Sequence, residues 1–189
     1  MSLMRLTAAR GPGRWLRPLG YALLLIAVQG ALSRLLAGTP LPPPNLFLLT
    51  GVALVGRASP RGALLGAYGV GLAQDVLGGG VLGWHAAGVA AGALAVLALG
   101  RAAVDLGPVR SALTVLAATV GQWLAFLVLT YWLRSDLVTA DALLRTAPLA
   151  LLTTLLASPV WERAVAWGLG PPNVGPLSLG PLGSRGGLR

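Results

Sequence analysis

The stretch Gly62–Leu99 reads GALLGAYGVGLAQDVLGGGVLGWHAAGVAAGALAVLAL, and it decides the fold class of the chain. Two apolar runs flank the triple glycine Gly78–Gly80, and Asp75 and His85 are the only residues in them that can carry a charge. A carboxylate placed in hydrocarbon is costly unless it is partnered, so an acid in such a run marks a packing or functional site. We therefore expect a membrane helical hairpin whose turn carries one polar pair.

Composition extends the membrane interpretation to the whole chain. The 189 residues are 56% hydrophobic and 10% charged, whereas a soluble domain averages about 25% charged residues. We predict an all-α membrane protein, a six-helix polytopic transmembrane bundle, with too little polar mass for a soluble catalytic domain. The absence of cysteine excludes disulfides, thiolate metal ligands and a cysteine nucleophile.

Six apolar segments, separated by Gly/Pro breaks or charged loops, are expected to be helices: Leu16–Leu36, Asn45–Val55, Gly62–Leu77, Val81–Leu99, Ser111–Leu133 and Leu143–Val160. The second is too short for a hydrocarbon core of about 30 Å, so we expect it to be short, tilted or partly re-entrant. Pro159 is expected to end the last helix. Residues 15–167 form the predicted transmembrane domain, and residues 1–14 and 168–189 are predicted to be disordered.

The arginines predict the orientation. With six spans, Arg34, Arg134 and Arg145 fall on one side and the other eleven arginines on the side of the termini. By the positive-inside rule both termini are cytoplasmic. The net charge of +9 does not indicate nucleic-acid binding, because the arginines are scattered between apolar runs. We expect the arginines to contact the anionic headgroups of membrane lipids instead.

Asp75 and His85 are expected at the same outer end of the hairpin, because each lies within about 8 Å of the turn at about 1.5 Å per helical residue. The simplest interpretation is an interhelical hydrogen-bonded pair that locks the hairpin. A contact with a partner or ligand is the second interpretation. A proton relay is the third, although the inner halves of both runs offer almost no polar residue beyond Tyr68.

Small residues predict close helix packing in lipid. Glycines recur on one face of each run of the hairpin: Gly62, Gly66 and Gly69 on the first, and Gly88 and Gly92 on the second. Gln29 and Gln122, in other apolar runs, are expected to form interhelical hydrogen bonds.

The corner Pro42–Asn45 predicts a helix start, because proline pre-sets the entry and Asn is a favoured N-cap. A docking surface is the alternative, and we expect this corner on the extracytoplasmic side, where the glycine turn also lies.

Signals for enzymatic chemistry are weak or absent. The chain has a single histidine, no pair of acids in one apolar segment, no GxSxG and no Walker loop. We expect no catalytic residues, no metal site and no cofactor.

The order of motifs between residues 44 and 100 resembles the rod shape-determining MreD family. That family pairs a Pro-Asn or Pro-Asp entry into its second helix with a Leu-x-x-Asp end to its third. A short turn and a Leu-Gly opening of the fourth helix follow. The matching positions are Pro44, Asn45, Asp75, Leu82 and Gly83.

The resemblance implies a noncatalytic scaffold in the bacterial cytoplasmic membrane that binds the bitopic protein MreC. It further implies work with RodA, a class B penicillin-binding protein and the MreB filament in lateral peptidoglycan synthesis and rod cell shape. It also implies a fold similar to the substrate-binding subunits of energy-coupling-factor vitamin transporters. The five matching positions and His85 are the candidate partner-binding or structural residues.

A vitamin-binding subunit of such a transporter is the alternative function. Those subunits often carry an Ala-x-x-x-Ala docking motif on their first helix, which Ala27 and Ala31 provide here. A vitamin site would need polar side chains converging at the outer face, for which the candidates are Arg34, Asp75, His85 and Arg134.

Overall fold

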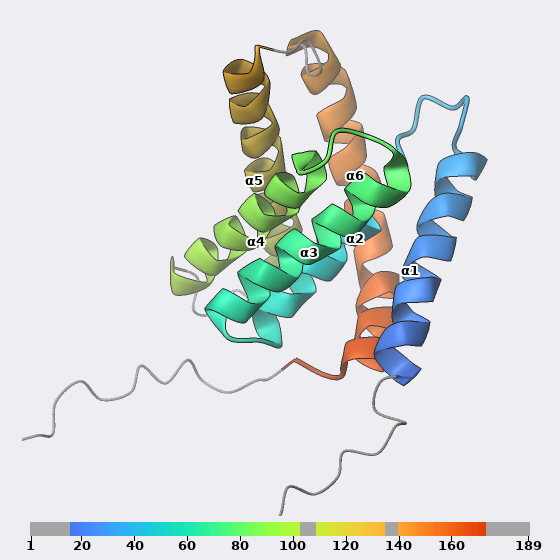
Figure 1. Cartoon of the computed structure of the whole chain (residues 1–189), viewed down its shortest axis with the longest axis vertical. Helices are drawn as coiled ribbons and strands as arrows, with labels where there is room; N and C mark the ends of the chain where they lie inside the picture. Colours follow the sequence, from blue (N-terminus) through green and yellow to red (C-terminus); the bar gives the residue numbers. More distant parts are fainter. Residues whose placement is uncertain (1–15, 103–108, 135–139, 173–189) are drawn as a thin grey trace, which may run out of the picture.

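The computed structural model describes residues 16–102, 109–134 and 140–172, and these residues are helical apart from short connections (Figure 1). The elements are α1 (Leu16–Leu35), α2 (Leu46–Ala53), the 3₁₀ turn η2 (Leu54–Gly56), α3 (Pro60–Gly78), α4 (Trp84–Ala102), α5 (Val109–Leu133) and α6 (Ala140–Leu169). The all-α prediction is confirmed for this part of the chain. The predicted disordered segment 1–14, and residues 173–189 of the predicted tail, lie outside the described residues.

The helices alternate in direction, so that α1, α3 and α5 run one way and α2, α4 and α6 return (Figure 1). The start of α1 and the end of α6 therefore lie at one end of the molecule, here called the terminal end. The opposite end, called the turn end, carries the last residues of α1, α3 and α5.

The short helix α2 is the centre of the packing, with contacts to all five other α-helices. One side of it joins a core with Leu48, Val52 and Val89, and the other joins a core with Phe47 and Trp161. A helix that is buried nearly all round needs no polar face, which explains why this segment shows no helical alternation of polar residues.

Helices α3 and α4 approach closely through small residues. The buried face of α3 consists of Ala63, Ala67, Gly71 and Asp75. A Cβ added to Gly71 would lie 2.5 Å from the carbonyl oxygen of His85 and 2.6 Å from Cα of Ala86. Gly71 therefore sits where the two backbones nearly touch.

The predicted glycine positions have different surroundings. Gly88 faces Phe126 and Gln122, Gly92 faces the backbone of Ala118, and Gly66 faces Leu54. Around Gly62 an added Cβ would meet only the preceding residues Ser59 and Ala58, and around Gly69 it would meet nothing within 4 Å. The buried face of α3 is offset by one or two residues from the predicted stripe, because Ala63, Ala67 and Gly71 face the partner helices instead.

Helix α6 does not end at Pro159, which corrects the sequence prediction. It continues through Pro148 and Pro159 to Leu169. A proline removes a backbone donor and leaves the carbonyl four residues earlier without its helical partner. For Pro159 that carbonyl belongs to Leu155, and the Ser158 hydroxyl donates to it at 2.9 Å. The adjacent serine thus satisfies the group that the proline leaves open.

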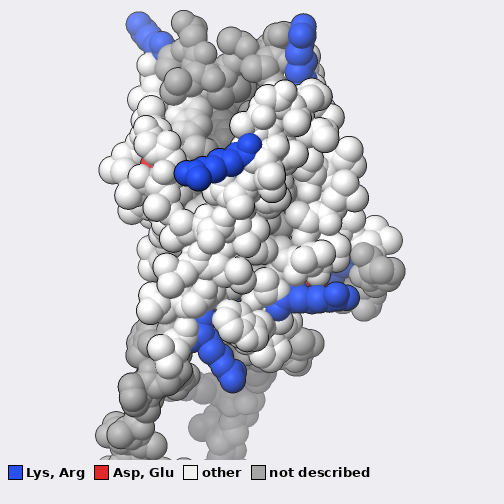
Figure 2. Space-filling model, turned by 90° about the vertical axis from the view of Figure 1, so that its right-hand side faces the viewer, with Lys and Arg blue, Asp and Glu red and all other residues white. Residues whose placement is uncertain are grey.

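Within the described ranges, three helical stretches are long and apolar enough to cross a membrane: α1, α5 and Leu144–Leu169 of α6. Two shorter apolar stretches, Leu46–Gly56 and Trp84–Gly100, accompany them. Figure 2 shows a face of the molecule that is almost free of charged side chains, with arginines mostly near its upper and lower margins. These features are those of a membrane protein.

The close approach at Gly71 predicts that alanine substitution has opposite effects at Gly71 and at Gly69, which lies on the same helix. Gly71→Ala should destabilise the protein by about 1–3 kcal/mol, since the new methyl group has no space between two backbones. Gly69→Ala should be neutral or stabilising by up to about 1 kcal/mol, because it adds helix propensity in open space. Unfolding titrations in mixed micelles, followed by tryptophan fluorescence, measure both. Equal effects of the two substitutions would contradict the packing described for α3.

Candidate functional site

Asp75 of α3 caps the start of α4. Its Oδ2 accepts from the backbone N–H of Gly83 at 2.8 Å and of Ala86 at 3.2 Å. Its Oδ1 accepts from the backbone N–H of His85 at 2.9 Å and from Nδ1 of the His85 ring at 2.8 Å. The structure therefore brings Asp75 and His85 together, and it adds three backbone donors to the pair.

The local sequence explains this geometry. The first amides of a helix have no intrahelical acceptor, and a negative charge beside them also interacts favourably with the helix dipole. Gly79 and Gly83 have positive φ values of 64° and 92°, which glycine adopts without strain. These two glycines let the chain reverse direction between α3 and α4. Asp75, on the last turn of α3, then accepts from the first amides of α4, as an N-cap side chain would. The carboxylate is buried, with Asp75 only 1% exposed.

His85 closes the site toward the turn end. Because an ionised carboxylate only accepts hydrogen bonds, the Nδ1 that faces Asp75 carries a proton. The ring also meets Phe126 edge-on, with centroids 5.7 Å apart, while Trp84 stacks on the same phenylalanine. The His85 side chain is 34% exposed, in contrast to the buried Asp75.

A second polar cluster surrounds the start of α2. Asn45 is the N-cap, and its Oδ1 accepts from Leu48 N at 2.9 Å. Three more hydrogen bonds tie this start to other helices. Asn45 Nδ2 donates to Gln122 Oε1 at 3.2 Å, and Asn45 N donates to Thr154 Oγ1 at 3.2 Å. Leu46 N donates to Gln29 Oε1 at 3.0 Å.

These partners locate the start of α2 inside the bundle. Gln122 and Thr154 lie near the middles of α5 and α6, about 16–23 Å from the helix ends at about 1.5 Å per residue. Pro44 is buried beside them. The corner at Asn45 is thus an internal cap, which confirms the helix start predicted there, whereas its extracytoplasmic side stays a prediction. The chain can enter the bundle here because side chains of α1 and α6 accept from its backbone N–H groups, while Gln122 of α5 accepts from the Asn45 side chain.

Leu82 and Gly83 lie in the connection between α3 and α4. Leu82 is 69% exposed at the turn end, and Gly83 contributes its N–H to Asp75. The six candidate residues therefore fall into two groups. Leu82 and part of His85 face outward, whereas the others form or border the internal caps.

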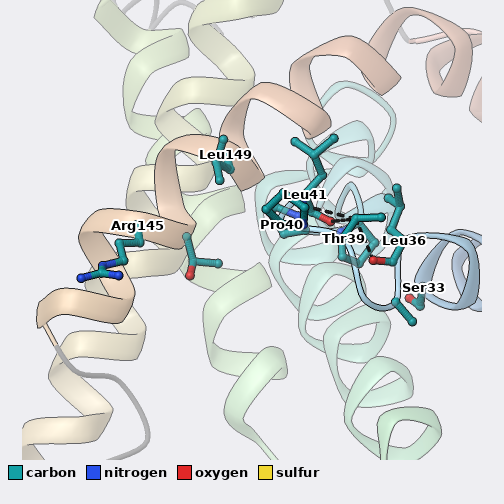
Figure 3. A pocket seen from close by; sticks show the side chains of 11 residues that line it. Ser33, Leu36, Thr39, Pro40, Leu41, Arg145 and Leu149 are labelled. Atoms are coloured by element: carbon teal, nitrogen blue, oxygen red, sulfur yellow. Dashed lines mark hydrogen bonds between the residues drawn. The ribbon is translucent and has the colours of Figure 1, made fainter.

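A cavity of about 530 Å³ opens near the turn end, between the α1–α2 connection and α6 (Figure 3). Its walls include Ser33, Leu36, Arg145 and Leu149. The Thr39 hydroxyl donates to the carbonyl of Leu36, so this hydrogen bond stabilises the connection between α1 and α2. None of the four side chains predicted to converge on a vitamin lines this cavity.

A larger cavity of about 880 Å³ lies at the terminal end, among the end of α2, α4, α5 and α6. Arg57 borders it and donates from Nε to the carbonyl of Gly170 and from Nη1 to that of Ala53, both at 2.8 Å. Burial lowers the pKa of Arg57 from its ordinary value, while Tyr21 and Glu162 nearby oppose that shift. An arginine remains protonated at neutral pH under such a shift.

The described residues contain no group of three or more His, Cys, Asp or Glu side chains that could hold a metal ion. The Gln29 and Gln122 bonds agree in type with the interhelical hydrogen bonds expected from sequence. Sequence reasoning missed the role of Thr154 and the three backbone donors to Asp75. A threonine inside an apolar run was the available signal for the former.

The fold and its capped helix starts define an all-helical protein with helices suited to a membrane. No protein-family model, curated protein or solved structure matches the chain.

The Asp75 cap predicts a graded loss of stability. Asp75→Leu should remove about 3 kcal/mol or more, because each hydrogen bond to a charged group contributes about 1.5–3 kcal/mol. Asp75→Asn should lose less, since it keeps one acceptor oxygen. His85→Ala should lose least, because the backbone donors keep their acceptor. Unfolding titrations in mixed micelles give the order, and a His85→Ala effect as large as that of Asp75→Leu would refute the capping role.

Proposed function

We propose that this protein is a noncatalytic six-span scaffold of the bacterial elongation machinery, in the cytoplasmic membrane with both termini inside. Its partner is an MreC-like bitopic membrane protein. Through that partner it supports lateral peptidoglycan synthesis with RodA, a class B penicillin-binding protein and MreB, and so maintains rod shape.

The arrangement of the helices supports the six-span topology. The six α-helices alternate in direction, and α2 begins within the bundle with its backbone donors satisfied by side chains, as hydrocarbon depth requires. The arginines separate between the two ends. Among the residues whose side chains the structure describes, the terminal end carries Arg17, Arg57, Arg61, Arg110 and Arg163, and the turn end carries Arg34, Arg134 and Arg145. The richer end faces the cytoplasm by the positive-inside rule.

One observation carries the scaffold proposal: the polar residues of the motif are already engaged by the chain itself. Asp75 accepts four hydrogen bonds, and Asn45 caps α2 while bonding to α5 and α6. A catalytic or transport group needs an atom that can meet substrate. Residues engaged in this way instead fix the shape of the turn between α3 and α4.

That turn has the chemistry of a docking surface. Val81 and Leu82 are exposed, and the partly exposed His85 follows them at the start of α4. Under the proposed topology they lie at the extracytoplasmic end, where a partner's membrane-proximal segment can reach them. Leu82 offers an apolar contact and His85 a hydrogen-bonding group, and the Asp75 cap fixes the backbone that carries both. This surface suits a partner segment with an apolar side chain and a hydrogen-bonding group.

The transporter alternative has its own supporting observation, the 530 Å³ cavity near the turn end. That volume falls within the range of about 300–1,000 Å³ that small-molecule sites occupy. Equilibrium binding of a fluorescent vitamin panel to the purified protein would favour this alternative, whereas stable co-purification with an MreC-like protein favours the scaffold.

The docking surface predicts a separation of binding from stability. Leu82→Ser should weaken co-purification of the MreC-like partner about tenfold, since losing a central apolar contact costs about 1–2 kcal/mol. Its melting temperature should stay near that of the parent. The matched control is Leu35→Ser, a similarly exposed leucine at the turn end of α1. Equal partner recovery from Leu82→Ser, Leu35→Ser and the parent would rule out this surface.

The topology predicts opposite reporter signals at two positions. Alkaline phosphatase fused after Arg189 should be inactive, because it stays in the cytoplasm. The same reporter fused after Arg134 should be active. Activity of the fusion at Arg189 would overturn the even number of spans or its orientation.

A further inference from the structure

The cavity at the terminal end combines apolar walls with positive charge. Its apolar lining includes Val55 of η2, Val96, Leu97 and Leu99 of α4, and Leu113 of α5. Arg57, Arg110 and Arg163 border the same space. The volume of about 880 Å³ is large enough to take part of a lipid, although not a whole one.

The charges of the cavity are unbalanced. Among the described residues that line it, Glu162 is the one acidic side chain, and the Ser111 hydroxyl donates to Glu162 Oε1 at 3.1 Å. Against this carboxylate stand three guanidinium groups. The start of α5 at Val109, next to Arg110, adds the positive end of a 25-residue helix.

Arg110 and Arg163 differ from Arg57 in exposure. Arg57 is half-buried and bonds to carbonyls of its own chain. The other two are exposed, one on α5 and one on α6, and both line the cavity. Two arginines of this kind at the rim of an apolar hollow suit a phosphate whose attached chains enter the hollow.

We propose that this cavity is a binding site for an anionic phospholipid of the cytoplasmic leaflet. The phosphate lies between Arg110 and Arg163, and an acyl chain enters among the leucines and valines of α4 and α5. The site rests on the proposed orientation of the bundle but not on the MreC-like partner. Basic pockets between membrane helices on the cytoplasmic side bind anionic headgroups in this manner.

Gly100 offers a substitution that fills the cavity and leaves every charge in place. It lines the hollow, and an added Cβ would meet nothing within 4 Å. Gly100→Leu should therefore occupy acyl-chain space without disturbing the packing of α4. The charge variant is Arg110→Gln with Arg163→Gln. Its matched control is Arg34→Gln with Arg134→Gln, which removes the same charge from the turn end.

The experiment uses the full chain in phosphatidylcholine nanodiscs, with increasing phosphatidylglycerol as the probe. Lipid retention is read by native mass spectrometry, and thermal stability is read in parallel. The parent and the turn-end control should retain phosphatidylglycerol and gain stability from it. The charge variant should bind it roughly thirtyfold more weakly, because each arginine near an anionic headgroup contributes roughly fivefold. Gly100→Leu should lose retention while it melts at or above the temperature of the parent.

Three results would overturn the proposal. The first is unchanged lipid retention by Gly100→Leu, which would mean that the hollow holds no acyl chain. The second is an equal loss in the turn-end control, which would mean nonspecific surface attraction. The third is displacement of the lipid by inorganic phosphate at matched concentration, which would mean a site for free phosphate. Co-purification of the partner is a separate measurement from lipid retention. The lipid site and the partner-binding role can therefore fail independently, and the two failures can be told apart.

Discussion

The structure depends on satisfying the backbone donors at two helix starts that lie among apolar side chains. A helix start leaves its first amides without acceptors, and such groups are costly away from water. In α4 the acceptor is the Asp75 carboxylate from the preceding helix. In α2 the acceptors are Asn45, Gln29 and Thr154, which come from three elements. The α4 cap joins two consecutive helices, and the α2 cap joins α2 to helices that include the distant α6, so each cap fixes tertiary structure as well as the end of a helix.

This constraint orders the rest of the bundle. Because α2 begins inside, it can be short and almost entirely buried, and the longer helices pack around it. The Asp75 cap holds α3 and α4 together at their common turn. Near that turn, Gly71 and Ala86 are small enough for the two backbones to meet. The same turn displays Leu82 at a fixed position. The proposed docking role follows from a rigid turn, and the proposed lipid site occupies the opposite end, where α2, α4, α5 and α6 leave a basic hollow.

Much of this could be predicted from sequence, but with clear limits. Apolar runs separated by glycine and proline predicted the helices, and spacing about the triple glycine predicted that Asp75 and His85 would meet. The depth of Asn45 could not be predicted, because its acceptors and donors lie on helices far away in sequence. The predicted packing face of α3 differed from the observed one by one or two residues. Nothing in the sequence distinguishes Gly71 from Gly62 and Gly69, because the three differ only in the residues that they face. The end of α6 was missed because Ser158 compensates for Pro159.

The central claim is that Asp75 caps α4 within the chain itself, before any partner binds. Hydrogen–deuterium exchange of the isolated protein in nanodiscs, read at the amides of Gly83, His85 and Ala86, tests it most directly. We predict that these amides are protected to the level of the interior of α4 without a partner. Exchange at the rate of an exposed loop, with protection appearing only after the partner is added, would contradict the account.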